Sequence, residues 1–254
     1  TTTTPASGSG PRVSTLDRET ADRLAATEYT RFATLLAELT GEQWRAPTVC
    51  AGWDVRAVAA HCLGMAEMAA TRRELVRQNI KAELRRRRRG EEPIDALTGL
   101  QVDEHADMTG REIAAAFATV GPRAARARAR TSGLVRRMRL PGESFPGDVP
   151  WTMGYLRETI LTRDPWMHRI DIADAVGVPM ELTAEHDGVL VDDVVREWAA
   201  RHGRACTLML AGPAGGRWSF GDGGPELVHD ALDFCRRLSG RAPADGLLAT
   251  QVPF

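Results

Sequence analysis

The chain has 254 residues, of which 43% are hydrophobic and 26% charged, and its formal net charge is −1. These values are typical of a soluble globular protein with a buried core, and they exclude a strongly basic chain that would attract nucleic acid or a membrane. The four cysteines, Cys50, Cys62, Cys206 and Cys235, form no CxxC pair, so we expect reduced thiols in a cytoplasmic protein. No apolar run reaches the ~18 residues that a membrane-spanning helix needs.

The amino-terminal part of the chain predicts a polar tail followed by a first helix. Residues 1–13 are rich in Thr, Ser, Gly and Pro and lack the apolar stretch of a signal peptide, so we expect a disordered tail there. Over residues 14–39, apolar side chains such as Leu24, Phe32 and Leu36 recur at helical spacing. An amphipathic helix is therefore predicted over this segment.

A loop and a second helix follow. Gly41, Pro47 and Gly52 mark the loop, and Asp54 is a residue type that caps the amino terminus of a helix. After Asp54 the apolar positions follow helical spacing. We expect this second helix to continue without a break to the arginine run at residues 85–89.

The arginine run itself predicts a solvated helix end. Five like charges can bind an acidic partner. However, residues 85–89 have no interleaved aromatic side chains, and Glu91 and Glu92 follow directly. We therefore expect no nucleic-acid binding at this segment.

Three further helical segments complete the first two thirds of the chain. Helical patterns extend over residues 94–107, 111–139 and 152–176, and a loop rich in Pro and Gly precedes the last of them. Antiparallel helices of this number and length predict a mostly α fold, an up-and-down four-helix bundle over residues 14–181.

The pattern changes after residue 181, where we expect a small α/β domain over residues 182–254. Residues 205–223 predict two short strands around a Gly-Pro-Ala-Gly-Gly turn, which together form a hairpin. Residues 225–241 predict a strand that leads into a helix.

Two segments distant in sequence carry a candidate metal site. Asp164 and His168 are four residues apart, so on a helix they share a face and can hold one divalent ion. With His61 from another helix, the set has two nitrogen ligands and one oxygen ligand, and three ligands leave a position open, as in catalytic sites. Because Asp164 precedes Pro165, either a new helix begins there or one long helix continues with a kink.

The strings PTVCAGWDVRAVAAH (residues 47–61), RDPWMHRIDIADA (residues 163–175) and the ending DFCRRLSGR…GLLATQVPF resemble the mycothiol-dependent maleylpyruvate isomerase family, which is one of the DinB-like metal-binding bundles. The resemblance covers nearly the whole chain after the tail. It implies a metal ion, usually zinc, on His61, Asp164 and His168. The best-known member of the family has Glu at the carboxylate position, where this chain has the shorter Asp164.

The resemblance also implies a chemistry. Mycothiol would bind at the open position as a thiolate, since zinc lowers the pKa of a thiol, and the protein would be an isomerase or S-transferase acting on a small electrophile. Its partners would be that substrate and the thiol, with no nucleic acid or membrane, and it would be a monomer or homodimer. The alternatives are a metal-dependent hydrolase with water as nucleophile and a non-catalytic protein that binds a ligand or metal.

Three residues are weaker candidates for cofactor binding. Trp53 and Trp166 can line the mouth of a pocket, although aromatic packing in the core explains them equally well. Arg241, in the carboxy-terminal segment, can contact an anion, or it can simply stabilise the end of a helix.

Other polar residues near the candidate ligands have more than one interpretation. Asp171 can hydrogen-bond the imidazole of His168, or it can form a surface ion pair. We expect Cys50 and Cys62 to fill the core rather than bind metal. His105 is a further ligand candidate, but a surface histidine is the preferred interpretation.

Overall fold

The computed structural model describes residues 10–141, 145 and 147–254. The chain forms two compact units, one over Pro11–Pro179 and one that includes Met180–Phe254. The domain boundary expected at residue 181 stays a prediction. Of the expected tail, residues 1–9 lie outside the described residues, whereas Arg12 donates a backbone hydrogen bond to Pro150 O at 2.9 Å. Among the described helices, none is both long enough and apolar enough to cross a membrane.

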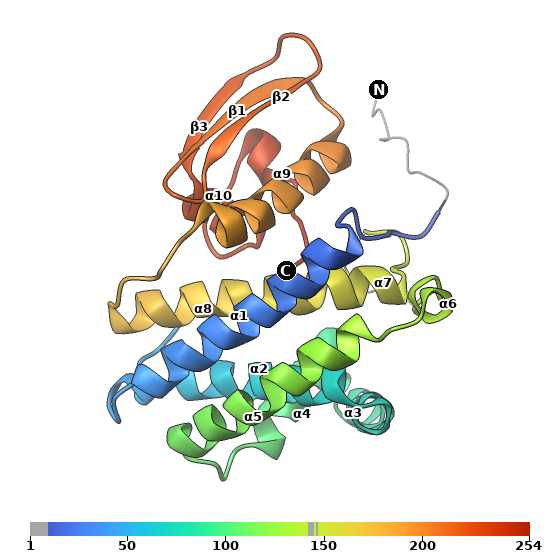
Figure 1. Cartoon of the computed structure of the whole chain (residues 1–254), viewed down its shortest axis with the longest axis vertical. Helices are drawn as coiled ribbons and strands as arrows, with labels where there is room; N and C mark the ends of the chain where they lie inside the picture. Colours follow the sequence, from blue (N-terminus) through green and yellow to red (C-terminus); the bar gives the residue numbers. More distant parts are fainter. Residues whose placement is uncertain (1–9, 142–144, 146) are drawn as a thin grey trace. The chain divides into compact units, whose positions relative to one another are not determined.

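Four helices form the bundle in the first unit: α1 (Arg18–Glu38), α2 (Val55–Ala70), α5 (Gly110–Ala129) and α8 (Leu161–Val176). Helix α1 packs against α5 and α8, and α2 packs against the same two helices, so the order around the bundle is α1, α5, α2, α8 (Figure 1). The predicted mostly α bundle is confirmed. Its core includes the fully buried side chains of Phe32, Leu63, Ile113 and Phe117.

Side-chain caps explain where the first two bundle helices begin. The Asp17 carboxylate accepts a hydrogen bond from Thr20 N at 2.9 Å, so α1 begins at Arg18, four residues later than expected. The Asp54 carboxylate accepts from Ala57 N at 2.7 Å, which confirms the cap predicted for α2. Both caps satisfy amide groups that have no partner within the helix.

Removing the cap of α2 is expected to have a modest effect on stability. Asp54→Ala should lower the free energy of unfolding by about 1 kcal/mol, because an amide of the first turn loses its acceptor. Urea denaturation of the purified protein measures this difference. Asp54→Asn is the control, since an asparagine oxygen can also cap, and an equal loss in both variants would contradict the capping argument.

The prediction of one uninterrupted second helix is wrong. Helix α2 ends at Ala70, and Thr71 takes an extended conformation with φ −142° and ψ 146°. The Thr71 hydroxyl then accepts a hydrogen bond from Glu74 N at 3.1 Å and starts a separate helix, α3 (Arg72–Arg89). The break lets α3 pack against α2 and against α4 (Pro93–Glu104).

The predicted fourth helix is also shorter than expected. Thr109 and Glu112 form a reciprocal capping box at the start of α5, but this helix ends at Ala129 instead of continuing to residue 139. Ser132 caps a short separate helix, α6 (Gly133–Arg136). A capping residue inside the expected helix thus divides it.

The last helix of the bundle continues through Pro165. Of the two alternatives for this segment, the structure therefore has the continuous helix and not a new helix that begins at Pro165. The short α7 (Met153–Tyr155) continues through a π-helical turn (Leu156–Ile160) into α8. Proline has no N–H to donate to the carbonyl of Leu161, four residues earlier. That carbonyl instead accepts a hydrogen bond from Arg128 Nη1 of α5 at 2.8 Å, so the helix continues.

The second unit is the predicted small α/β module. Its elements are α9 (Val189–His202), β1 (Cys206–Ala211), β2 (Gly216–Phe220), β3 (Glu226–Asp230) and α10 (Ala231–Leu238), with single helical turns at Ala184–Gly188 and Gly246–Ala249. A further helical turn, Gln43–Arg45, lies between α1 and α2 in the first unit. The sheet order is β2-β1-β3. The hairpin of β1 and β2 and the succession of β3 and α10 confirm the predictions, whereas α9 was not predicted.

Candidate metal centre

Three side chains from two helices of the bundle converge at one point. His61 extends from α2, and Asp164 and His168 extend from α8. The Nε2 atom of His61 lies 3.2 Å from Asp164 Oδ1, and Nε2 of His168 lies 3.6 Å from the same oxygen. One ligand atom from each residue lies within 4.8 Å of the other two. The structure therefore brings together the three residues that the sequence pattern singled out.

The three side chains differ in their access to solvent. The side chains of His61 and His168 are 3% and 8% exposed, whereas that of Asp164 is 13% exposed. Because the helix continues through Pro165, Asp164 and His168 keep the one-turn separation that puts both on the same face.

Asp171 orients the ring of His168. Its Oδ2 atom lies 2.9 Å from His168 Nδ1, and the residue is only 2% exposed. An ionised carboxylate can only accept a hydrogen bond, so in a neutral His168 ring the proton belongs on Nδ1 and the Nε2 lone pair is available to a metal on the side of Asp164. The hydrogen bond predicted between these residues is confirmed, and the alternative of a surface ion pair is wrong.

These donors fit a divalent metal ion. Two imidazole nitrogens and one carboxylate oxygen are a common ligand set of catalytic zinc, and a histidine ligand that donates its other N–H to a carboxylate is the usual arrangement. A ring nitrogen lone pair that faces a carboxylate oxygen is also electrostatically unfavourable unless a proton or a metal cation lies between them. The residues at this point therefore fit the metal that the resemblance implies.

Two cysteines lie near this centre and differ from each other. Cys62 belongs to the apolar core, as expected, and burial, together with the charge of Asp164, raises the pKa of its thiol well above the ordinary value. Cys50 packs against the same core, but its Sγ atom also lies 3.5 Å from Asp171 Oδ2 and 3.9 Å from His168 Nδ1. This second contact of Cys50 was not predicted, because only folding brings the loop beside α8.

The three weaker candidates lie in different surroundings. The half-buried Trp53 ring packs against His61, with 5.4 Å between the ring centroids. Trp166 is completely buried, as the alternative of core packing expects. Arg241 belongs to the other unit, where its backbone N–H donates to Arg236 O at 2.8 Å. A role in cofactor binding stays a prediction for all three.

His105 is buried, so the preferred interpretation as a surface histidine is wrong. Its side chain joins α4 to α2, since Nδ1 lies 2.7 Å from Gln101 O and Nε2 lies 3.3 Å from Glu67 Oε2. Burial lowers the pKa of this imidazole, but the hydrogen bonds to Glu67 and to the Gln101 carbonyl outweigh burial, and the net pKa lies above the ordinary value.

The raised pKa of His105 predicts a pH dependence of stability. A group whose pKa is higher in the folded than in the unfolded protein stabilises the fold at pH values below its unfolded pKa. This contribution is lost as the pH rises through the folded pKa. Urea denaturation with a chelator present should therefore show a larger deficit for His105→Asn below the ordinary histidine pKa than well above it. A deficit that is the same at both pH values would contradict this prediction.

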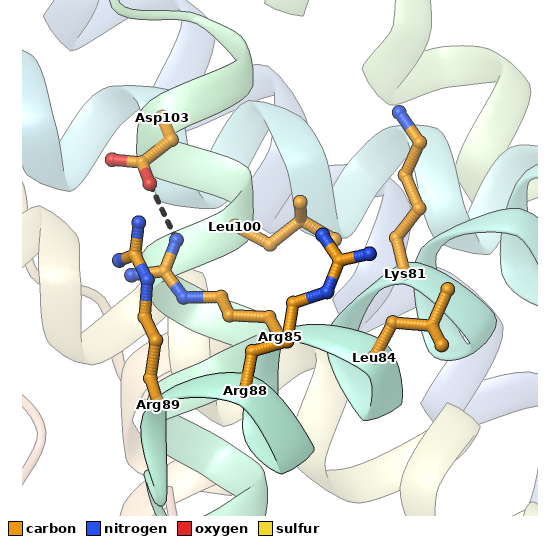
Figure 2. Close-up of a pocket in the computed structure, with 7 residues that line it drawn as sticks. All are labelled: Lys81, Leu84, Arg85, Arg88, Arg89, Leu100 and Asp103. Carbon is orange, nitrogen blue, oxygen red and sulfur yellow. Dashed lines mark hydrogen bonds and ion pairs between the residues drawn. The ribbon is translucent and has the colours of Figure 1, made fainter.

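The arginine run lies at the carboxyl end of α3 and is partly neutralised by neighbouring carboxylates. Arg85 pairs with Glu91 and with Asp103 of α4, and Figure 2 shows the second pair at the edge of a small pocket. Glu83 pairs with two further arginines of the run. This agrees with the interpretation of residues 85–89 as a solvated helix end.

Comparison with known proteins places the chain in a family. The family model for the mycothiol maleylpyruvate isomerase N-terminal domain matches residues 25–173, a segment that contains all three candidate ligands. The crystal structure of the mycothiol-dependent maleylpyruvate isomerase is similar, with a TM-score of 0.55, 15% sequence identity and coverage of 89% of this chain and 90% of that chain. The structure of its histidine-to-alanine mutant has a TM-score of 0.54 at the same identity and coverage.

At this identity the two solved structures support the fold alone. The comparison with curated proteins gives no match. Since the family model covers more than half of the residues, the protein belongs to the mycothiol maleylpyruvate isomerase family.

Proposed function

We propose that the protein is a metal-dependent enzyme that uses mycothiol to isomerise a small electrophile of the maleylpyruvate type. The observation that carries this proposal is the convergence of His61, Asp164 and His168 on one point inside the bundle. Membership of the family supports the choice of thiol and substrate, and the ligand set supports a metal, for which zinc is the first candidate.

Each residue of the centre has a distinct part in this proposal. His61 and His168 would bind the ion through Nε2, and Asp164 would bind it through a carboxylate oxygen. Asp171 orients the ring of His168, and the ring of Trp53 packs against that of His61. A bound divalent ion would lower the pKa of the thiol, whose sulfur would then add reversibly to the double bond of the substrate.

We also propose a cytoplasmic enzyme whose partners are a small substrate and a low-molecular-weight thiol. None of the four cysteines, all of which are among the described residues, forms a disulfide, which supports a reducing compartment. The ion pairs around residues 85–89 support a solvated helix end rather than a surface for nucleic acid.

The test is an isomerase assay with the zinc-loaded protein, mycothiol and maleylpyruvate, in which the trans product and the free thiol are both measured. We expect the trans isomer to form only when zinc and mycothiol are both present, with no net loss of thiol. Binding of mycothiol is measured separately by the shift in melting temperature of the zinc-loaded protein.

Other results would identify a different reaction. Stoichiometric loss of free thiol would indicate an S-transferase, and turnover without any thiol would indicate a hydrolase. A zinc-loaded protein that neither binds mycothiol nor converts the substrate would contradict the proposal.

A further inference from the structure

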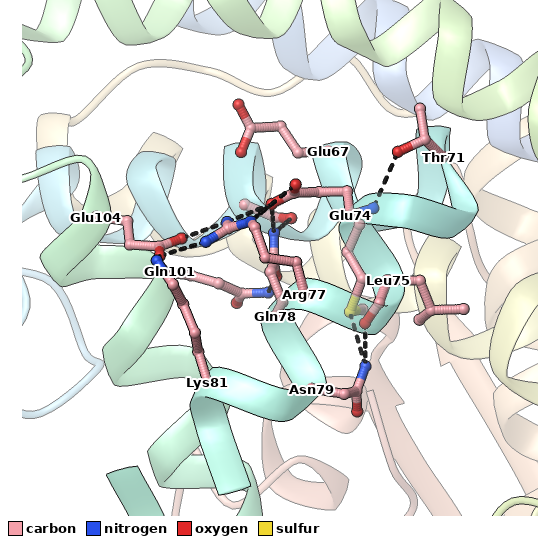
Figure 3. Close-up of polar contacts among 12 residues, drawn as sticks. Glu67, Thr71, Glu74, Leu75, Arg77, Gln78, Asn79, Lys81, Gln101 and Glu104 are labelled. Carbon is pink, nitrogen blue, oxygen red and sulfur yellow. Dashed lines mark hydrogen bonds and ion pairs between the residues drawn. The ribbon is translucent and has the colours of Figure 1, made fainter. Parts of the chain in front are cut away.

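A chain of buried polar groups leads from His61 to the surface through two glutamines. Gln101 of α4 and Gln78 of α3 are both completely inaccessible to solvent. His61 Nδ1 lies 2.8 Å from Gln101 Oε1, and Gln101 Nε2 lies 2.9 Å from Gln78 Oε1. Gln78 Nε2 in turn lies 3.0 Å from Gly64 O and 3.1 Å from Glu74 Oε1, and Figure 3 shows both glutamines in this network.

The far end of this chain determines the direction of every hydrogen bond in it. A backbone carbonyl and a carboxylate can only accept hydrogen bonds, so the amide NH₂ of Gln78 must face Gly64 and Glu74. Gln78 Oε1 therefore faces Gln101 and accepts from its NH₂ group. This leaves the amide oxygen of Gln101 against His61, where it too can only accept, so the proton on Nδ1 must come from the histidine.

The Glu74 carboxylate is held in place by charge. Arg77 donates hydrogen bonds to Glu74 and also to Glu104 of α4 (Figure 3). The hydrogen bonds from Arg77 and, to a lesser extent, from Gln78 lower the pKa of Glu74. Burial raises this pKa, but the hydrogen bonds outweigh it. The end of the chain thus remains an ionised acceptor at neutral pH.

Gly64 makes the close approach of Gln101 to α2 possible. A Cβ atom at this position would lie 2.6 Å from Gln101 Cγ and 2.7 Å from Gln101 Cβ. Such distances are too short for any side chain larger than hydrogen. The glycine therefore provides the space in which Gln101 reaches His61, and its carbonyl orients Gln78.

We propose that Gln78 and Gln101 are positioning residues that keep the proton of His61 on Nδ1, so that the Nε2 lone pair faces the metal centre. This inference rests on the proposed metal site. Without Gln101, the proton of His61 would favour Nε2, where Asp164 Oδ1 lies 3.2 Å away and would accept it. A metal would then have to displace that proton. His168 obtains the same orientation from the Asp171 carboxylate.

The experiment measures the tautomer and the metal affinity, and it does not depend on turnover. The position of the His61 ring proton is observed by ¹⁵N NMR of the histidine-labelled, metal-free protein, at a pH high enough that the ¹⁵N shifts show a neutral ring. Zinc affinity is measured by competition with a chelator. We expect a protonated Nδ1 in the wild type. In Gln101→Met, we expect the proton on Nε2 and a zinc Kd raised about 10- to 100-fold.

Two further variants separate positioning from packing. Gln101→Glu keeps an acceptor against His61, so the proton should stay on Nδ1. Gln78→Met does not touch His61, but it releases the amide of Gln101, so both tautomers should appear and the Kd should rise by a smaller factor. A change in packing alone would leave the tautomer unchanged in all three variants.

The inference is overturned if His61 of the wild type carries its proton on Nε2 alone. It is also overturned if Gln101→Met and Gln78→Met both leave the tautomer and the zinc Kd unchanged. A protein that shows the expected tautomers and affinities but converts no maleylpyruvate would support the inference, while the proposed function alone would fail.

Discussion

Replacing His61 by alanine is expected to weaken zinc binding about a thousandfold, or by about 4 kcal/mol. In the proposed centre His61 would provide one of three protein ligands, and its Nε2 atom lies 3.2 Å from Asp164 Oδ1 on the facing helix. Without it, only Asp164 and His168 of α8 remain, and they lie on a single helical turn. The ion would lose its only link between α2 and α8.

Competition with a chelator at neutral pH measures the Kd of zinc for the wild type and for His61→Ala. His229→Ala is the matched control, because this histidine lies on β3 in the other unit, and its zinc affinity should equal that of the wild type. If the wild type and His61→Ala bind zinc equally well, or if neither binds it, the metal centre does not exist as described.

The second large effect concerns the hydrogen bonds around Pro165. Arg128→Met is expected to lower the free energy of unfolding by about 3 kcal/mol, because buried acceptors that lose a charged donor cost about 1–3 kcal/mol each. Arg128 Nη1 donates to Leu161 O at 2.8 Å, and its Nη2 donates to the hydroxyl of Thr162. Both acceptors lie in the first turn of α8, just before Asp164.

A double-mutant cycle with Pro165→Ala isolates the part of this cost that the proline causes. Alanine at position 165 restores an N–H that can donate to the Leu161 carbonyl. We therefore expect Arg128→Met to cost about 1–2 kcal/mol less in the Pro165→Ala background than in the wild type. Urea denaturation provides all four free energies. Strictly additive costs would show that Arg128 does not replace the hydrogen bond that the proline lacks.

The link between these two predictions is the geometry of α8. The helix carries Asp164 and His168, two of the three candidate ligands. They share a face because the helix continues through Pro165, which has no backbone N–H to donate to the preceding turn. Arg128 of α5 supplies the donor from outside the helix. A neighbouring helix therefore stabilises the turn that carries two residues of the candidate metal centre.

Local sequence patterns were sufficient for much of the fold. The apolar spacing and the Asp54 cap predicted α2, the Gly-rich turn predicted the hairpin of β1 and β2, and the spacing of Asp164 and His168 predicted that they share a face. These features depend on residues within a few positions of one another, and backbone geometry relates such residues directly. The residue types alone suggested that His61 joins this pair, and the family resemblance implied the same three ligands.

Only the tertiary structure decided which faces meet and which polar groups are buried between them. Nothing in the local pattern distinguishes Gln78 or Gln101 from a solvated glutamine, and Thr71 divided a helix that periodicity predicted as continuous. The hydrogen bond between His61 and Gln101 joins residues 40 positions apart in sequence, and the contact between His61 and Asp164 joins residues 103 positions apart. The physical reason is that such contacts arise when helices pack, and helical periodicity specifies an apolar face without specifying its partner.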